Sequence, residues 1–240
     1  GGSFGMKSAL YPEYLAILHA ARVLGRPLKW IDDRAGSFLS DQQAREAVFT
    51  AELALDTEGN FLALSIEGLA NLGAYLTTYG PLMTTISIER NVPSLYQTPL
   101  MAIATRCVFT NTVPIGPYRG AGRPEGNYIM ERLIDAAARE LDRDPAGLRS
   151  QNMIPPQAIP YRAPSGLEYD SGDFPAVLES ALEKADWPGF AGRRRMSQSR
   201  GRLRGRGLAC YLEATAAPSR EMGGIRFEPD GRGTLITGTL

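Results

Sequence analysis

The chain has 240 residues, of which 43% are hydrophobic and 22% are charged. A chain of this length and composition has enough apolar material for one sizeable core or two small ones. Its 26 basic residues equal its 26 acidic residues, so no net field favours nucleic acid, a membrane surface or an acidic partner.

The two cysteines indicate the location of the protein, and the ends of the chain indicate whether the sequence is a fragment. Cys107 and Cys210 lie far apart in apolar runs, which favours buried free thiols and a reducing, cytoplasmic location. No apolar run reaches the roughly 18 residues that a membrane helix needs, and no targeting signal opens the chain. The chain begins inside a glycine-rich loop and stops at Leu240 inside a strand-like pattern, so we expect a fragment of a longer protein.

The first elements follow from apolar spacing. After the glycine-rich loop, a helix is predicted to begin near Pro12 and to end at Gly25. Residues 28–31 predict a short buried strand. Apolar residues alternate over 47–55 and again over 62–66, on either side of a polar turn, and therefore predict a β-hairpin.

The remaining elements mix helices and strands. Residues 72–99 combine glycine and proline with little periodicity and therefore predict a long loop. Residues 101–109, which come after this loop, predict a strand. The clearest helix spans 125–141, and Asp144 and Asp173 are predicted to cap two further helices, the second ending near Lys184. Strands are expected at 208–213, 224–227 and 234–237.

Seven arginines lie between residues 193 and 206, among serine and glycine. This composition predicts a solvated linker, and binding of a partner or of phosphate is the alternative interpretation.

The opening loop, residues 1–8, has the small residues that let backbone amides converge on an anion ahead of a helix. It nearly matches the phosphate-binding loop of nucleoside triphosphatases. That motif needs glycine directly before the Lys-Ser pair, where this chain has Met6, so we disfavour triphosphate binding. A loop for another cofactor and a turn without a ligand both remain open.

A second glycine-rich loop, residues 116–125, places Arg119 between small residues just before the clearest helix. Such a loop can bring its backbone close to a large polar cofactor. Arg119 could instead brace the loop against carboxylates.

Seven short motifs in a fixed order give the chain a family resemblance. They are Gly1-Gly-Ser-Phe-Gly5, Asn71-Leu-Gly-Ala-Tyr75, Tyr118-Arg-Gly120, Glu131-Arg-Leu-Ile-Asp135, Asp144-Pro145, Leu148-Arg-Ser-Gln-Asn152 and Tyr169-Asp-Ser-Gly-Asp173. In this order they resemble the molybdenum-binding large subunit of the xanthine dehydrogenase and aldehyde oxidase family, which has aspartate where this chain has Asn71.

The resemblance implies an α+β chain in three parts. Residues 1–158 would form a mixed-sheet molybdopterin-binding domain, residues 159–206 a connecting segment with one helix and the arginine-rich linker, and residues 207–240 the start of a second molybdopterin-binding domain.

The resemblance also implies a cofactor and a site. Molybdenum would be carried on molybdopterin, in the cytosine dinucleotide form of bacterial members, without direct ligation by the protein. The implied cofactor-binding residues are Gly2, Ser3, Phe4, Gly5, Tyr118, Arg119, Gly120 and Ala121. The family's general-base glutamate is expected beyond Leu240, so no catalytic residue is assigned here and the isolated fragment is expected to be inactive.

Partners and reaction follow from the same resemblance. An iron–sulfur subunit with [2Fe-2S] clusters and a FAD subunit would accept electrons, in a cytoplasmic dimer of heterotrimers. The substrate would be an aldehyde or an N-heterocycle, oxidised with oxygen from water.

Departures from the family pattern restrict which reactions and substrates we expect. Copper-containing carbon monoxide dehydrogenases carry a copper-ligating cysteine where this chain has Gly120, so that copper site is not expected, and the loop resembles the form II carbon monoxide dehydrogenase-like sequences. Purine oxidisers carry a glutamate near the place of Ser8 and an aromatic residue at that of Ala121, so purines are disfavoured. A form II protein and a cofactor-free interaction or assembly module of the same fold are the alternatives.

Overall fold

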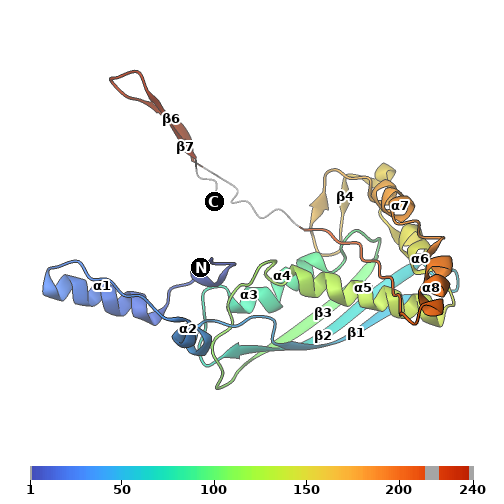
Figure 1. Ribbon diagram of the computed structural model, residues 1–240, viewed down its shortest axis with the longest axis horizontal. Coiled ribbons are helices and arrows are strands. Elements are labelled where there is room, and N and C mark those ends of the chain that lie inside the picture. Colours follow the sequence, from blue (N-terminus) through green and yellow to red (C-terminus); the bar gives the residue numbers. More distant parts are fainter. Residues whose placement is uncertain (1, 214–221, 238–240) are drawn as a thin grey trace.

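The computed structural model describes residues 2–213 and 222–237, so Gly1 of the opening motif lies outside the described part. Figure 1 shows a β-sheet covered by helices, with a helical arm at one end. The helices are α1 (Pro12–Leu24), α2 (Arg34–Ser40), α3 (Gly80–Thr84), α4 (Ile86–Asn91), α5 (Arg123–Glu140), α6 (Pro145–Asn152), α7 (Phe174–Lys184) and α8 (Phe190–Ser199), with short 3₁₀ turns at Met6–Ser8 and Pro156–Ala158. The strands are β1 (Ala47–Leu55), β2 (Phe61–Gly73), β3 (Leu100–Phe109), β4 (Tyr161–Arg162), β5 (Glu168–Tyr169), β6 (Gly223–Phe227) and β7 (Gly233–Thr237).

The central sheet has the order β1-β2-β3 and is mixed. β1 pairs with β2 antiparallel as the predicted hairpin, from Ala47 opposite Ala70 to Leu55 opposite Phe61. β3 pairs with β2 in parallel. Parallel pairing requires a crossover, and the chain between the two strands contains α3 and α4. The predicted long loop over 72–99 was therefore wrong in part, because two helices of five and six residues are too short to show a helical period.

The core lies between one face of this sheet and α5 (Figure 1). Leu64 and Ile66 of β2 face Met130 and Ile134 of α5, and all four side chains are buried. The alternating burial along β1 and the helix α5 are what the apolar spacing predicted, although two apolar residues of that spacing, Tyr128 and Leu141, are exposed. The α+β class with a mixed sheet is thus confirmed.

A buried ionic cluster ties α5 to α6. Arg149 of α6 is fully buried and donates from Nε to Glu131 Oε2 at 2.8 Å and from Nη2 to Asp135 Oδ1 at 2.9 Å. The Tyr96 hydroxyl donates to the other Glu131 oxygen at 2.5 Å. Burial, together with the Glu131 carboxylate, raises the pKa of Tyr96 well above its ordinary value. The two motifs around Glu131 and Arg149 therefore meet as one structural cluster.

The α1–α2 arm extends away from the sheet (Figure 1). α1 begins at Pro12 and ends at its C-cap Gly25, as predicted, but none of its residues is buried. The predicted strand at 28–31 was wrong: Trp30 and Ile31 are exposed and the segment forms no strand. No described strand pairs with it, and Asp33 instead accepts a hydrogen bond from Gly36 N at 2.7 Å as the cap of α2.

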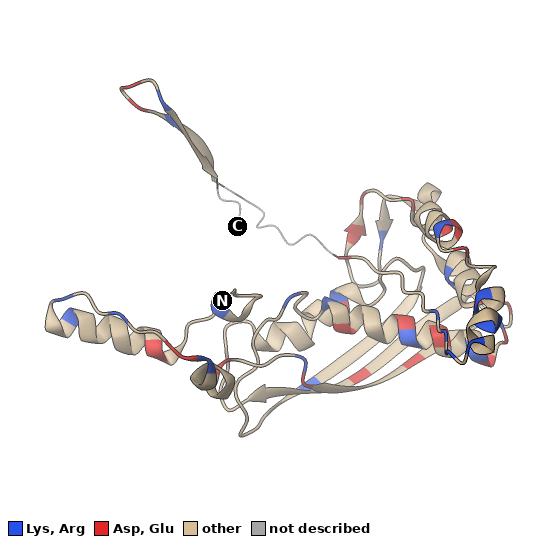
Figure 2. Cartoon of the chain, viewed as in Figure 1, with Lys and Arg blue, Asp and Glu red and all other residues tan. Residues whose placement is uncertain are grey.

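The arginine-rich segment is not a simple linker. Residues 190–199 form α8, and the arginine-rich chain that follows folds back, so that the Arg206 guanidinium lies 3.7 Å above the Trp187 ring. The arginines of α8 are coloured blue on the cartoon in Figure 2. The expectation of one helix in 159–206 was wrong, because α8 has too few apolar residues to show a helical stripe, while the outer boundaries 159 and 206 stay predictions.

The described C-terminal segments behave differently from one another. Residues 208–213 form no strand, although Leu208, Cys210 and Leu212 pack against the core. The strands predicted at 224–227 and 234–237 are present as β6 and β7, which pair antiparallel with every residue exposed. Both cysteines are free thiols, as predicted, and partly buried. Within residues 2–213 and 222–237, no helix is both long and apolar enough to cross a membrane.

Candidate functional site

The first glycine-rich loop forms a tight turn ahead of α1. Phe4 and Gly5 have φ angles of 53° and 109°, both in the left-handed region. Met6 N donates to Ser3 O at 3.1 Å, and Lys7 N donates to Ser3 Oγ at 3.2 Å. No described residue accepts a hydrogen bond from the backbone N–H of Phe4 or Gly5. The loop therefore leaves two consecutive amide donors available to a ligand.

The two predicted loops meet. A Cβ atom placed on Gly5 would lie 2.5 Å from the carbonyl oxygen of Pro117, closer than atoms can approach. Only glycine therefore allows the two backbones to touch here. The structure thus brings Gly5 of the first loop against Pro117, which directly precedes Tyr118 of the second loop.

The second loop turns its carbonyl groups into the protein. Tyr118 O accepts from Ala121 N at 2.7 Å, Arg119 O accepts from Arg45 Nη2 at 2.6 Å, and Gly120 O accepts from Arg123 N at 3.0 Å. By contrast, no described residue accepts a hydrogen bond from the N–H of Tyr118, Arg119 or Gly120. The loop therefore presents a row of donors and no competing acceptor from these three peptides.

The backbone of this loop is held in an unusual shape. Gly120, Ala121 and Gly122 have φ angles of 93°, 50° and 93°. Consecutive amides in such left-handed turns form concave nests that bind anions. Within this turn the Ala121 N–H donates to Tyr118 O, while no described residue accepts from the N–H of Gly120 or Gly122, which leaves these two donors for a polar ligand.

Arg45 is a site residue that the sequence did not reveal. Besides donating to Arg119 O, it forms an ion pair from Nε to Glu125 Oε1 at 3.2 Å, and its guanidinium lies 4.7 Å from the centre of the Tyr118 ring. Nearby, Gln43 forms a parallel β-bridge with Ile115. In this bridge Gln43 N donates to Pro114 O at 3.1 Å, and Gln43 O accepts from Gly116 N at 2.9 Å. No local pattern marks Arg45, because its contacts lie far along the chain.

The Arg119 side chain is exposed, and no described carboxylate pairs with it. The interpretation that Arg119 braces the loop against carboxylates is therefore not supported within the described residues. It is the backbone of Arg119 that is braced, by Arg45.

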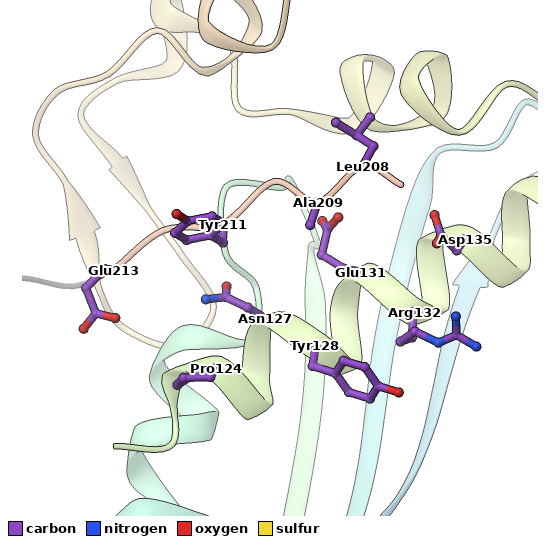
Figure 3. Close-up of a pocket in the computed structure, with 10 residues that line it drawn as sticks. All are labelled: Pro124, Asn127, Tyr128, Glu131, Arg132, Asp135, Leu208, Ala209, Tyr211 and Glu213. Atoms are coloured by element: carbon purple, nitrogen blue, oxygen red, sulfur yellow. The ribbon is translucent and has the colours of Figure 1, made fainter. Parts of the chain in front are cut away.

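A separate cavity of about 430 Å³ lies between α5 and residues 208–213 (Figure 3). Asn127 and Glu131 line it from α5, while Ala209 and Tyr211 line it from the C-terminal segment. None of the predicted cofactor residues lines it, and its Glu131 carboxylate is already held by Arg149 and Tyr96. Among the described residues, no cluster of three His, Cys, Asp or Glu side chains is placed to hold a metal ion.

Known proteins provide an independent comparison. Residues 1–153 match the molybdopterin cofactor-binding domain family. The chain is 34% identical over 99% of its length to the gamma subunit of the 6-hydroxypseudooxynicotine dehydrogenase complex of Paenarthrobacter nicotinovorans, covering 30% of that protein. It is 31% identical over its whole length to the carbon monoxide dehydrogenase large chain of Hydrogenophaga pseudoflava, covering 32% of it.

The solved structures agree with these relatives. Quinoline 2-oxidoreductase from Pseudomonas putida 86 superposes with a TM-score of 0.91 at 30% identity, over the whole of this chain and 32% of that one. The chain therefore spans about a third of the length of the relatives that it matches. It belongs to the family of molybdopterin cofactor-binding domains found in molybdenum hydroxylase large subunits.

Proposed function

We propose that this chain is the part of a molybdenum hydroxylase large subunit that holds molybdopterin between residues 2–5 and 118–121. One observation carries the proposal: the two loops touch at Gly5 and Pro117, and the amides around this contact have no partner among the described residues.

The residues present fit this cofactor. Molybdopterin carries a phosphate and a pterin ring with several acceptor atoms, and unpaired amides in a nest are the donors that such groups need. The N–H groups of Phe4, Gly5, Tyr118, Arg119 and Gly120 would hold it, in the cytosine dinucleotide form implied for bacterial members. When bound, the molybdenum centre supplies two-electron oxidation with oxygen taken from water.

This chain's own residues would bind and enclose rather than transfer protons. The exposed rings of Phe4 and Tyr118 would cover the cofactor and exclude water, because each belongs to one of the two loops that we propose to bind it. Within the described residues we assign no general base to this site. That group is expected in a part of the subunit beyond residue 240.

The substrate that we propose is an N-heterocycle or an aldehyde. Two of the compared proteins are named for quinoline and for 6-hydroxypseudooxynicotine, which supports a nitrogen-containing ring. Ala121 lacks the aromatic ring that would stack a purine.

A form II carbon monoxide dehydrogenase-like protein is the second candidate, and the 31% identity to a carbon monoxide dehydrogenase large chain favours it. Copper chemistry does not fit this loop. Gly120 offers no thiolate, and a Cβ atom there would lie 2.4 Å from Pro124 Cγ. A cofactor-free assembly module of the same fold is the third candidate.

Partners are proposed from the same family. An iron–sulfur subunit with [2Fe-2S] clusters and a FAD subunit would carry electrons away, in a cytoplasmic dimer of heterotrimers. The names of the relatives, a complex subunit and a large chain, support assembly with other subunits.

A pair of matched glycine substitutions in the full-length complex tests the proposal. Gly120 and Gly166 have φ angles of 93° and 84°, but a Cβ atom collides with Pro124 only at Gly120 and meets nothing within 4 Å at Gly166. Gly120→Ala should therefore lose most of its molybdopterin, measured as the fluorescent oxidised pterin, while Gly166→Ala keeps it. Equal pterin content in both variants and the wild type would contradict the assignment of this loop.

A further inference from the structure

The peptide between Arg119 and Gly120 has a fixed orientation. Its carbonyl oxygen accepts a hydrogen bond from Arg45 Nη2 at 2.6 Å. In a planar trans peptide the C=O and the following N–H point in opposite directions. Because Arg45 holds the oxygen on one side, the N–H of Gly120 must point to the other side, where no described residue accepts from it.

Arg45 is itself held at several points. Its Nε pairs with Glu125 in the first turn of α5 at 3.2 Å, and its guanidinium lies over the Tyr118 ring. Its side chain is 34% exposed, so much of it is shielded from water. The guanidinium therefore links the loop aromatic ring, the loop carbonyl and the start of α5 as one rigid unit.

The loop needs such a restraint. Gly120 has no Cβ, so its backbone populates either sign of φ, and the Arg119–Gly120 peptide can flip with little steric penalty. A flipped peptide would present the Arg119 carbonyl where the Gly120 N–H now points. A donor toward the cofactor would then become an acceptor, which repels phosphate and pterin oxygens.

We propose that Arg45 is a positioning residue that locks the Arg119–Gly120 peptide, so that the Gly120 N–H faces molybdopterin. This inference rests on the proposed function, and it goes beyond it by assigning a role to a residue outside both glycine-rich loops.

The test uses the full-length complex with four single substitutions. Arg45→Met removes every polar contact of the guanidinium, whereas Arg45→Lys retains a donor that can reach the Arg119 carbonyl. Glu125→Gln removes only the charge that Arg45 pairs with. Arg143→Met is the matched control, because Arg143 Nη1 also donates to a carbonyl, that of Glu58, at 2.6 Å, but at the far end of β2.

Two readouts are measured on each purified complex: the rate of molybdopterin release, and the electron paramagnetic resonance line shape of Mo(V) in the retained cofactor. Arg45→Met should release molybdopterin about tenfold faster, the effect of losing one charge-assisted hydrogen bond, and should alter the Mo(V) line shape. Arg45→Lys should recover part of both losses. Glu125→Gln should show a smaller change, and Arg143→Met should match the wild type.

Different outcomes separate the inference from the proposed function. A wild-type complex without molybdopterin would overturn the proposed function. A wild type that holds the cofactor, together with an Arg45→Met variant of unchanged release rate and line shape, would overturn the role of Arg45 alone. The role of Arg45 would also be overturned if Arg143→Met lost cofactor as quickly as Arg45→Met, or if Arg45→Lys showed no recovery.

Discussion

The guanidinium of Arg149 lies fully buried against the carboxylate of Glu131, with Nη2 and Oε2 2.8 Å apart. Glu131 is on α5 and Arg149 on α6, so the pair fixes the helix that follows the candidate cofactor loop. Two of the motifs that gave the family resemblance therefore stabilise the scaffold and do not touch the site.

Breaking this pair should be strongly destabilising. Arg149→Met leaves the Glu131 carboxylate buried with only the Tyr96 hydroxyl, so we expect the free energy of unfolding to fall by about 3–5 kcal/mol. Hydrogen exchange of the peptides spanning α5 and α6, followed in urea, measures this change in the free energy of unfolding. Arg132→Met, at an exposed position one residue further along α5, should change it by less than about 0.5 kcal/mol. Similar losses in both variants would show that the pair does not carry the effect.

Asn71 should not tolerate the aspartate that the family pattern has at this position. Its Nδ2 donates to Glu46 Oε2 at 2.6 Å, so Asn71→Asp would set two carboxylates against each other. We expect a loss of about 1–3 kcal/mol at pH 7.

The swap Asn71→Asp with Glu46→Gln restores a donor and an acceptor, so it should recover most of the stability. Thermal melting of the single and double variants decides the matter. A double variant no more stable than Asn71→Asp would contradict this account.

Cys210 should react slowly with alkylating agents. Burial is the main cause that raises the pKa of its thiol from 9.0 to about 11, and the Glu131 carboxylate adds to it. Two pKa units mean about a hundredfold less thiolate at pH 8. Iodoacetamide labelling, located by peptide mass spectrometry, should therefore be far slower at Cys210 in the folded complex than after denaturation.

The same shift sets a pH dependence of stability. Because the folded-state pKa is raised, the contribution of the Cys210 thiol is complete below about pH 9 and is lost as the pH rises towards 11. A Cys210→Ala variant should lose less stability than the wild type over this interval. Identical slopes would mean that Cys210 does not titrate as described.

Installing a cysteine at residue 120 should not create a copper site. A Cβ atom at Gly120 would lie 2.4 Å from Pro124 Cγ, and its φ of 93° is unfavourable for any other residue. Gly120→Cys should therefore bind no stoichiometric copper and should lose molybdopterin. Elemental analysis after copper loading provides the check, and one copper per chain with cofactor retained would restore the copper-dependent reading of the loop.

Much of the sheet domain could be predicted from the sequence. β1 and β2 alternate apolar and polar residues, and α5 carries a buried stripe, so local periodicity was sufficient. Asp144 and Asp173 were recognised as caps and do accept hydrogen bonds from Gly147 N and Ala176 N. These features depend on neighbours within a few residues.

The helices α3, α4 and α8 were missed because they are short or have few apolar residues, whereas the two wrongly predicted strands depend on partners that are distant in sequence. Residues 28–31 and 208–213 have strand composition, but a strand also needs a neighbouring strand, and neither segment has one among the described residues. Leu212 N instead donates to Ser94 Oγ at 3.3 Å. The contact between Gly5 and Pro117 could be expected only through the family resemblance, and Arg45 had no signal at all. The assignment of the eight loop residues to the cofactor stays a prediction.

The molybdenum content of the native complex, measured by elemental mass spectrometry after purification from its source, tests the central claim most directly. We predict about one molybdenum per large subunit, because this chain belongs to the molybdopterin-binding family and its two loops present unpaired amides together. Absence of molybdenum in cells supplied with molybdate would contradict the account and would favour a cofactor-free assembly module.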